Sequence, residues 1–377
     1  MAEKRMKAFV LGEDGRVTLQ QVLVPNIGPY DVLVKIDKAS VCGTDIGIVE
    51  RSKDPLQRFK NMEETPSGTV IGHEGCGVIV AIGQKVSERK IHDYVALESH
   101  YSCESCVADG LPLDACSTQG IIGVHGIKND DGSRQPPRGG VYAEYCSIPY
   151  NSTHVLHKQL AHDFHASLFE PAGNSWKIMQ WFKKKGLPNK IAVFGCGPHG
   201  LYAQLFARHV GIQHITAFET DQYRINFAKR FAAADTVLHF NDAHTLKNEF
   251  DLVLDFVGLQ QIVQQAVSLV KPGGTIVFFG LKEEYNSAIA GKTFAQIIFE
   301  EEEFSHTEQG KQFTVKGFTG RTEQGWKTLI PEIEQNAELR KKLQQPLTIL
   351  GSLNKLEPYF TDGFPKNLLK IGMTEFA

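Results

Sequence analysis

The sequence contains no long apolar run. No window approaches the roughly 20 uninterrupted apolar residues that a membrane-spanning helix requires. Residues 1–7 carry several charges, but no apolar segment follows them, so we expect no secretory signal. Both absences predict a protein that works in the cytoplasm and has no membrane partner.

A strong excess of charge is also absent. The chain has 40 Lys and Arg against 43 Asp and Glu, which gives a net charge of −3. This balance leaves no basic face for nucleic acid, which we therefore do not expect as a partner.

Cysteine is scarce, at seven in 377 residues, and the count is odd. Without an export signal, seven thiols predict reduced cysteines and metal ligands rather than a disulfide framework.

Two kinds of pattern are present, in a chain long enough for two domains. Residues 7–11 and 31–36 read as strands between Gly, Pro and Asn turns, which predicts a mostly β beginning. From about residue 163 onward, short apolar strands alternate with helical segments. That alternation is typical of a doubly wound parallel sheet, an α/β fold. The strands expected there are 191–194, 214–218, 236–238, 252–256 and 275–279.

A glycine-rich turn follows the first of these strands. It reads Gly195-x-Gly197-x-x-Gly200 and leads into a helical run. A strand that breaks sharply into a helix presents free N–H groups and the positive end of the helix dipole, which suit a pyrophosphate. The alternative is an ordinary strand-to-helix turn of some other doubly wound domain. The cofactor-binding residues expected here are Gly195, Gly197, Pro198, His199 and Gly200.

The choice of cofactor depends on the end of the next strand. Glu219 stands there, about 20 residues on, where a carboxylate would hold the ribose hydroxyls of NAD and repel the 2′-phosphate of NADP. Arg224 follows closely in the sequence and could soften that preference. We expect NAD, with Glu219 and Arg224 both beside it.

Two sets of residues have the chemistry of metal ligands. Cys42, His73 and Glu170 offer the thiolate, imidazole and carboxylate that suit a catalytic zinc, which takes three protein ligands and keeps one open position. Their spacing alone leaves open that they are a core cysteine, a hydrogen-bonded histidine and a helix-start glutamate. The second set lies in an irregular lobe, where four ligands would close a structural zinc site and a metal-free lobe is the alternative. Its members are Cys103, Cys106, Asp109 and Cys116.

Several motifs together resemble the zinc-dependent medium-chain alcohol dehydrogenases. Val-Cys-Gly-Thr-Asp (41–45), Gly-His-Glu (72–74), Phe-Glu-Pro-x-Gly-Asn (169–174), the glycine-rich turn and Gly-Phe-Thr-Gly-Arg (317–321) stand in the order and rough spacing of that family. Within it, the chain is most similar to the L-threonine 3-dehydrogenases and the sorbitol-type polyol dehydrogenases. The resemblance implies a GroES-like, mostly β catalytic domain (1–170 and 321–377) and a Rossmann NAD-binding domain (171–320).

The resemblance also implies roles for single residues. It makes Cys42, His73 and Glu170 the catalytic zinc ligands, and Glu74 a carboxylate that exchanges with the bound water or orients the site. Thr44 matches the hydroxyl that passes the alcohol proton toward the cofactor ribose. Further matches are His100 near the substrate, Arg224 and Arg321 near the cofactor or substrate, and a structural zinc held by Cys103, Cys106, Asp109 and Cys116.

One position departs from the family pattern. Many of these dehydrogenases carry a histidine shortly after the Thr-Asp pair, where this chain has Gly47. The proton relay then ends in water or in another group.

The expected function is the zinc- and NAD-dependent oxidation of a secondary alcohol on a small polar molecule, such as a polyol, a sugar derivative or an amino alcohol like threonine. Two alternatives stay open: a zinc-free NAD(P)H reductase of the same fold, and a non-catalytic dinucleotide-binding member of the family. The resemblance implies a homodimer or homotetramer.

Overall fold

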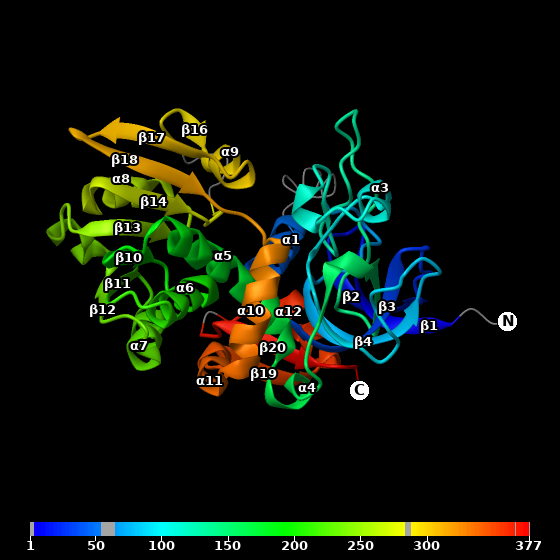
Figure 1. Ribbon diagram of the computed structural model, residues 1–377. Coiled ribbons are helices and arrows are strands. Elements are labelled where there is room, and N and C mark those ends of the chain that lie inside the picture. Colours follow the sequence, from blue (N-terminus) through cyan, green and yellow to red (C-terminus); the bar gives the residue numbers. More distant parts are fainter. Residues whose placement is uncertain (1–3, 54–64, 283–287, 366, 377) are drawn as a thin grey trace. The chain divides into compact units, whose positions relative to one another are not determined.

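The computed structural model describes residues 4–53, 65–282, 288–365 and 367–376. The chain divides into two compact units, the first combining Met1–Pro171 with Thr322–Ala377 and the second consisting of Ala172–Arg321. The second unit is the middle of the chain, coloured from green through yellow to orange in Figure 1. Each boundary differs by one residue from the one that the sequence suggests. No helix in the described ranges is long and apolar enough to cross a membrane.

A mostly antiparallel sheet forms the framework of the first unit. It consists of β3 (Asp31–Ser40), β4 (Glu74–Ile82), β5 (Tyr94–Leu97), β8 (Tyr145–Pro149), β9 (Thr153–Val155), β19 (Leu347–Ser352) and β20 (Lys370–Thr374). The order is β19-β20-β3-β4-β5-β9, and β8 also pairs with β3. Only the pair β19–β20 is parallel in this sheet. The mostly β character expected for this part of the chain is confirmed.

The pairing of β3 with β4 decides where the candidate site forms. Apolar side chains of β3, among them Val34 and Ile36, are buried in the core of the unit. The register sets Ser40, the last residue of β3, opposite Glu74, the first residue of β4. The chain on either side of this pair is therefore brought to one edge of the sheet.

Smaller elements complete the first unit. Two small two-stranded sheets pair β1 (Arg5–Leu11) with β2 (Val17–Leu23) and β6 (His100–Tyr101) with β7 (Gly120–Ile121). The helices are α1 (Gly43–Lys53), α3 (Glu104–Ala108), α4 (Leu160–Asp163), α10 (Glu323–Gln335), α11 (Ala337–Gln344) and α12 (Glu357–Asp362). The 3-10 helices are η1 (Leu113–Ala115), η2 (Tyr150–Ser152), η3 (Ala166–Leu168) and η5 (Leu353–Leu356).

The second unit is built on a largely parallel sheet. Its strands are β10 (Lys190–Phe194), β11 (His214–Glu219), β12 (Thr236–His239), β13 (Phe250–Asp255), β14 (Val270–Phe278), β17 (Glu303–Glu308) and β18 (Lys311–Gly317). They follow the order β12-β11-β10-β13-β14-β18-β17. All neighbours from β12 to β18 are parallel, and β17 is antiparallel to β18 at the edge.

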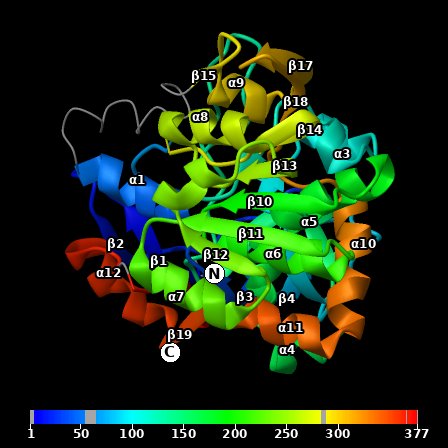
Figure 2. The same cartoon turned by 90° about the vertical axis from the view of Figure 1, so that its left-hand side faces the viewer.

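Helices cover both faces of this sheet. In Figure 2, α8 (Gln260–Leu269) and α9 (Phe294–Phe299) lie on one side, and α6 (Pro198–His209) and α7 (Gln222–Phe231) lie on the other. Because strand side chains alternate, β10 can bury apolar residues on both faces at once, which is the doubly wound arrangement expected. Further elements are η4 (Phe240–Thr245), β15 (Ala288–Ile289), β16 (Lys292–Thr293) and α5 (Phe169–Lys185), whose first turn contains the unit boundary.

Candidate active site

Three side chains that can bind a metal meet beside the end of the β3–β4 pair. The Cys42 sulfur, a His73 ring nitrogen and a Glu74 carboxylate oxygen all lie within 4.8 Å of one another. Cys42 stands between β3 and α1, and His73 and Glu74 stand at the start of β4. Cys42 is half-buried and the other two are buried. A thiolate, an imidazole and a carboxylate form a set that fits zinc and leaves one position for a further ligand.

Asp45 holds two members of this group in place. Its Oδ2 accepts hydrogen bonds from the Cys42 backbone N–H (2.9 Å) and the Tyr142 hydroxyl (2.6 Å), and its Oδ1 lies 3.0 Å from His73 Nδ1. A carboxylate at Nδ1 orients the ring and leaves Nε2 for a metal. Burial lowers the pKa of His73, but the charges of Asp45 and Cys42 raise it well above its usual range, so the site favours a cation.

Glu74 has one oxygen engaged and one free. Its Oε2 accepts hydrogen bonds from Lys370 Nζ and Ser40 Oγ, and Lys370 also donates to the Val41 carbonyl oxygen at 2.9 Å. Burial raises the pKa of Glu74, but the charges of Lys370 and His73 bring it below its usual value. The Glu74 Oε1 is buried and accepts no hydrogen bond within the described part of the chain. A buried carboxylate oxygen without a donor is a place where a metal ion fits.

Glu170, the expected carboxylate ligand, does not belong to this close group. It is buried in the first turn of α5. Burial lowers the pKa of Lys370, whereas the charges of Glu74 and, less strongly, Glu170 raise it, so Glu170 acts on the site from a greater distance. Glu74, the carboxylate expected to exchange with the bound water or to orient the site, is the one in the close group, and the role of Glu170 as a zinc ligand stays a prediction.

The expected proton relay has one member near this group. The Thr44 hydroxyl oxygen lies 3.8 Å from the Cys42 sulfur, on the exposed first turn of α1. One turn further on, a Cβ added to Gly47 would lie 3.1 Å from Arg51 Nη1. The Arg51 guanidinium therefore occupies space beside Gly47, where many family members carry a histidine side chain.

A buried carboxylate orients His100. The Glu98 Oε1 accepts a hydrogen bond from the His100 backbone N–H (3.0 Å) and lies 3.2 Å from its Nδ1, while Oε2 accepts one from the Trp326 indole N–H (2.7 Å). Trp326 in turn stacks on His154, with ring centroids 4.0 Å apart. Pairing at Nδ1 fixes the orientation of the half-buried His100 ring.

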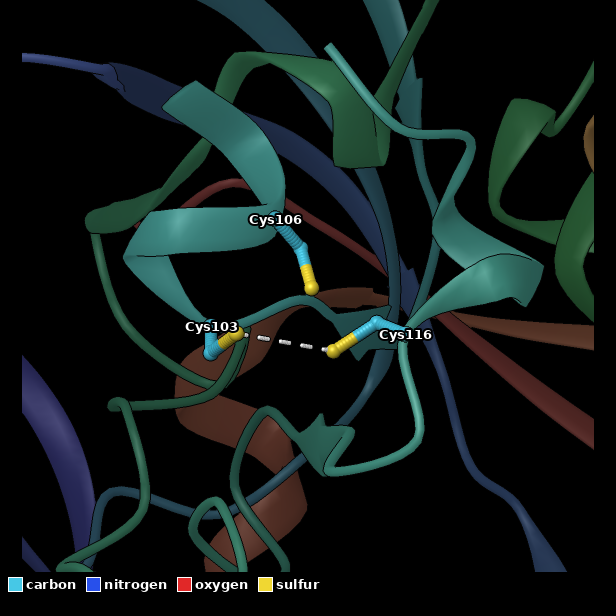
Figure 3. Close-up of side chains that lie close together, drawn as sticks. All are labelled: Cys103, Cys106 and Cys116. Atoms are coloured by element: carbon cyan, nitrogen blue, oxygen red, sulfur yellow. Dashed lines mark hydrogen bonds between the residues drawn. The ribbon is translucent and has the colours of Figure 1, made fainter. Parts of the chain in front are cut away.

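Three cysteines converge in the lobe that follows β6, as Figure 3 shows. Cys103 precedes α3, Cys106 lies within it, and Cys116 follows η1. Their sulfur atoms lie within 4.8 Å of one another. Asp109, the expected fourth ligand, is not part of this group. It ends α3, where its backbone N–H donates to the Ser105 carbonyl oxygen (2.9 Å), and it is exposed to solvent.

A cavity of about 480 Å³ opens at the carboxyl ends of the second unit's parallel strands. This edge of a doubly wound sheet is where dinucleotides bind. The cavity brings together the residues that the sequence singled out for the cofactor, Gly195, Gly197, Pro198, His199, Gly200, Glu219 and Arg224.

The glycines of this turn are required by its geometry. Gly195 has φ = +95°, a conformation that side chains disfavour. A Cβ on Gly200 would lie 1.9 Å from the Gly195 carbonyl oxygen, so the helix and the strand can only meet this closely without a side chain there. A Cβ on Gly197 would meet little, because its nearest neighbour is Arg224 Nη1 at 4.0 Å. The backbone at Gly197 is thus open to a ligand.

Glu219 is tied to the glycine-rich turn. Its Oε2 accepts a hydrogen bond from the Cys196 N–H (2.9 Å), and its Oε1 accepts one from the Thr220 N–H (2.7 Å). Arg321, also expected near the cofactor, does not line the cavity; its Nη1 donates to Asn174 Oδ1 at 2.9 Å.

Sequence reasoning missed four charged residues. Asp45 carried a usable signal, an acid in the first turn of a helix three residues after a cysteine. Asp255 carried another, since it ends an apolar strand at the ligand-binding edge; burial raises its pKa to about 7. Glu98 and Lys370 gave no local signal, because their partners Trp326 and Glu74 lie 228 and 296 residues away.

Comparisons with known proteins agree with this geometry. The alcohol dehydrogenase GroES-like domain matches residues 28–158, and the zinc-binding dehydrogenase domain matches residues 198–335. The chain is 29% identical to L-threonine 3-dehydrogenase of Bacillus subtilis (strain 168) over 331 residues, 85% of each chain. It is also 29% identical to an Escherichia coli O1:K1 / APEC protein of the same name, over 73% of this chain and 77% of that one.

Solved structures share the fold. The 2R,3R-butanediol dehydrogenase of Bacillus subtilis superposes with a TM-score of 0.70 at 18% identity, covering 98% of this chain and 99% of that one. The galactitol-1-phosphate dehydrogenase of Escherichia coli gives a TM-score of 0.70 at 22% identity, covering 98% and 100%. The two domain models match one after the other along the chain. Together with the similar dehydrogenases, they show that the chain belongs to the zinc-binding, medium-chain alcohol dehydrogenase family.

Proposed function

We propose that the protein oxidises a secondary alcohol of a small polar molecule, a polyol, a sugar derivative or an amino alcohol such as threonine, with zinc and NAD. The observation that carries this proposal is the group of Cys42, His73 and Glu74, with its free, buried carboxylate oxygen. The names of relatives support the substrate class, since they act on threonine, butanediol or galactitol 1-phosphate.

Zinc, when bound, supplies a Lewis acid that lowers the pKa of an alcohol hydroxyl. Residues of this chain would hold the metal and move the proton. Cys42 and His73 would hold the metal together with a carboxylate, Glu74 or Glu170, and Asp45 keeps the His73 ring turned so that Nε2 is available. Thr44, with its hydroxyl 3.8 Å from the Cys42 sulfur, would relay the proton that the alcohol loses: its oxygen accepts that proton while its own hydroxyl hydrogen passes on toward the cofactor ribose.

NAD, when bound, accepts the hydride. In the second unit, the first turn of α6 offers backbone N–H groups to the pyrophosphate, beside the open backbone at Gly197. Glu219 faces the same cavity and provides the carboxylate for the ribose hydroxyls. Arg224 lines the same cavity and is the cation that could soften this preference for NAD over NADP.

A substrate panel tests the proposal. Polyols, threonine and amino sugars are offered with NAD while NADH absorbance is followed, and the zinc content of the same sample is measured. We expect NADH formation with at least one secondary alcohol and loss of that activity when a chelator removes the metal. Two matched variants, Glu74→Gln and Glu170→Gln, show which carboxylate binds zinc. The variant that lacks the zinc-binding carboxylate should lose zinc and activity together. A zinc-free protein that still turns over would overturn the proposal.

Glu219 is expected to determine the preference for NAD. Glu219→Ala removes a charged acceptor worth about 1.5–3 kcal/mol, so kcat/KM for NAD should fall roughly 10- to 100-fold and the ratio of NAD to NADP should shrink. The steady-state kinetics of both cofactors measure this. Glu219→Gln is the control, because it keeps an acceptor for the Cys196 N–H and removes only the charge. An unchanged ratio in both variants would mean that another group discriminates.

A further inference from the structure

The three lobe cysteines are spaced for a metal rather than for a disulfide. The sulfurs of Cys103 and Cys116 are 3.8 Å apart, and all seven cysteines of the chain are free thiols. A disulfide needs about 2.05 Å between its sulfurs. A tetrahedral zinc with bonds of about 2.3 Å to sulfur sets two thiolates about 3.8 Å apart. Figure 3 shows the Cys106 sulfur turned toward the space between the other two.

Within the part of the chain that the structure describes, the fourth corner of this tetrahedron has no protein ligand of the usual kinds. Among the described residues, the group of Cys, His, Asp and Glu ligand atoms contains only the three sulfurs, and exposed Asp109 is outside it. The polar atoms next to the sulfurs are hydroxyls: Ser105 Oγ lies 3.2 Å from Cys103, and Thr118 Oγ1 lies 3.7 Å from Cys116. Hydroxyls seldom bind zinc but can hydrogen-bond a small molecule that does.

Solvent has access to the site. Cys103 and Cys106 are half-exposed, and only Cys116 is buried. A structural zinc with four protein ligands is closed, whereas three protein ligands leave a position for water or another small ligand.

We propose that Cys103, Cys106 and Cys116 bind zinc through three thiolates and leave the fourth position to an exchangeable small ligand, water or a low-molecular-weight thiol. Each cysteine gives up its proton when the metal binds. An incoming thiol likewise gives up its proton when it replaces the bound water, so no oxidant or reductant is involved. This site is independent of the proposed oxidation of an alcohol, because it lies in a separate lobe and needs no cofactor.

X-ray absorption at the zinc edge tests the proposal on the full-length chain with Cys42→Ser, which removes a thiolate from the other candidate site. We expect three sulfurs at about 2.3 Å and one oxygen or nitrogen at about 2.0 Å. Adding 2-mercaptoethanol should replace the light atom by a fourth sulfur. The Co²⁺-loaded protein gives a second readout, since a fourth thiolate shifts the sulfur-to-cobalt charge-transfer bands and their titration yields a dissociation constant.

Asp109→Asn is the matched variant. If Asp109 were the fourth ligand, this change would alter the light-atom shell and the cobalt spectrum, and the proposal would fail. The proposal would also fail if the lobe binds no metal, because no site would then be present. It would fail again if 2-mercaptoethanol leaves the spectra unchanged, because the site would then be closed. Unchanged spectra in Asp109→Asn, together with a saturable response to the thiol, support the open site.

Discussion

Replacing Lys370 by Met is expected to lower the free energy of unfolding by about 3–5 kcal/mol. The side chains of Lys370 and Glu74 are 3% and 0% exposed, and they form an ion pair inside the first unit. Removing the cation leaves the Glu74 carboxylate in a medium that solvates it poorly, which costs far more than the pair itself contributes. Urea unfolding of the zinc-free protein at neutral pH measures the loss.

The pH dependence gives this prediction a second readout. In the unmodified protein the pKa of Glu74 is lowered, so its contribution to stability is present at neutral pH and is lost as the pH falls. In Lys370→Met, burial shifts the pKa of Glu74 upward, opposed by the His73 charge and the Ser40 hydrogen bond, because the Lys370 charge no longer lowers it. The variant therefore loses less stability than the parent as the pH falls. The difference between the two proteins should therefore shrink toward acid pH.

Lys327→Met is the matched control for Lys370→Met. Lys327 pairs with Glu323 one turn away on α10, but these side chains are 64% and 41% exposed. Loss of such a pair costs about 0.5 kcal/mol or less. Combining Lys370→Met with Glu74→Gln should recover part of the stability, because no buried charge is left. A loss below about 1 kcal/mol in Lys370→Met would contradict the account of an uncompensated carboxylate.

Asp45→Asn is expected to weaken zinc binding at the candidate active site by about 10- to 100-fold. The Asp45 carboxylate bonds to the His73 ring and to the Cys42 backbone N–H, so it orients two ligands at once. Asn keeps the size but loses the charge that favours a cation there. Competition with a chromophoric chelator measures the affinity, in a Cys106→Ser background so that the lobe does not contribute.

The control for Asp45→Asn is Asp131→Asn, which changes an exposed carboxylate that interacts with nearby Ser133 in the first unit. Its zinc affinity should equal that of the parent protein. A change below about threefold in Asp45→Asn would mean that Cys42 and His73 hold their positions without this carboxylate, and that its role is structural.

The sequence by itself determined the features that depend on neighbouring residues. The turn from Gly195 to Gly200 could be recognised because backbone conformation and helix start are local properties, and one strand further on Glu219 completes the pattern. The alternation of strands and helices likewise predicted the doubly wound sheet. The three lobe cysteines could be singled out because their spacing is short.

The grouping of the candidate metal ligands required the tertiary structure. Glu170 and Glu74 were both expected at the site; the β3–β4 register accounts for Glu74 lying with Cys42 and His73, and the role of Glu170 as a ligand stays a prediction. Asp109 had the right place in the sequence but ends its helix in solvent. Sequence spacing does not report the direction in which a side chain points, and a metal site depends on that direction.

The buried charges were also decided by tertiary structure alone. Lys370 reaches Glu74 across 296 residues, and Trp326 reaches Glu98 across 228. A buried charge or polar group must find a partner, but any partner that the fold brings within reach satisfies it. The sequence therefore determined which chemical groups the protein has and the local turns that present them, whereas long-range packing determined which of these groups meet, as Glu74 meets Cys42, His73 and Lys370.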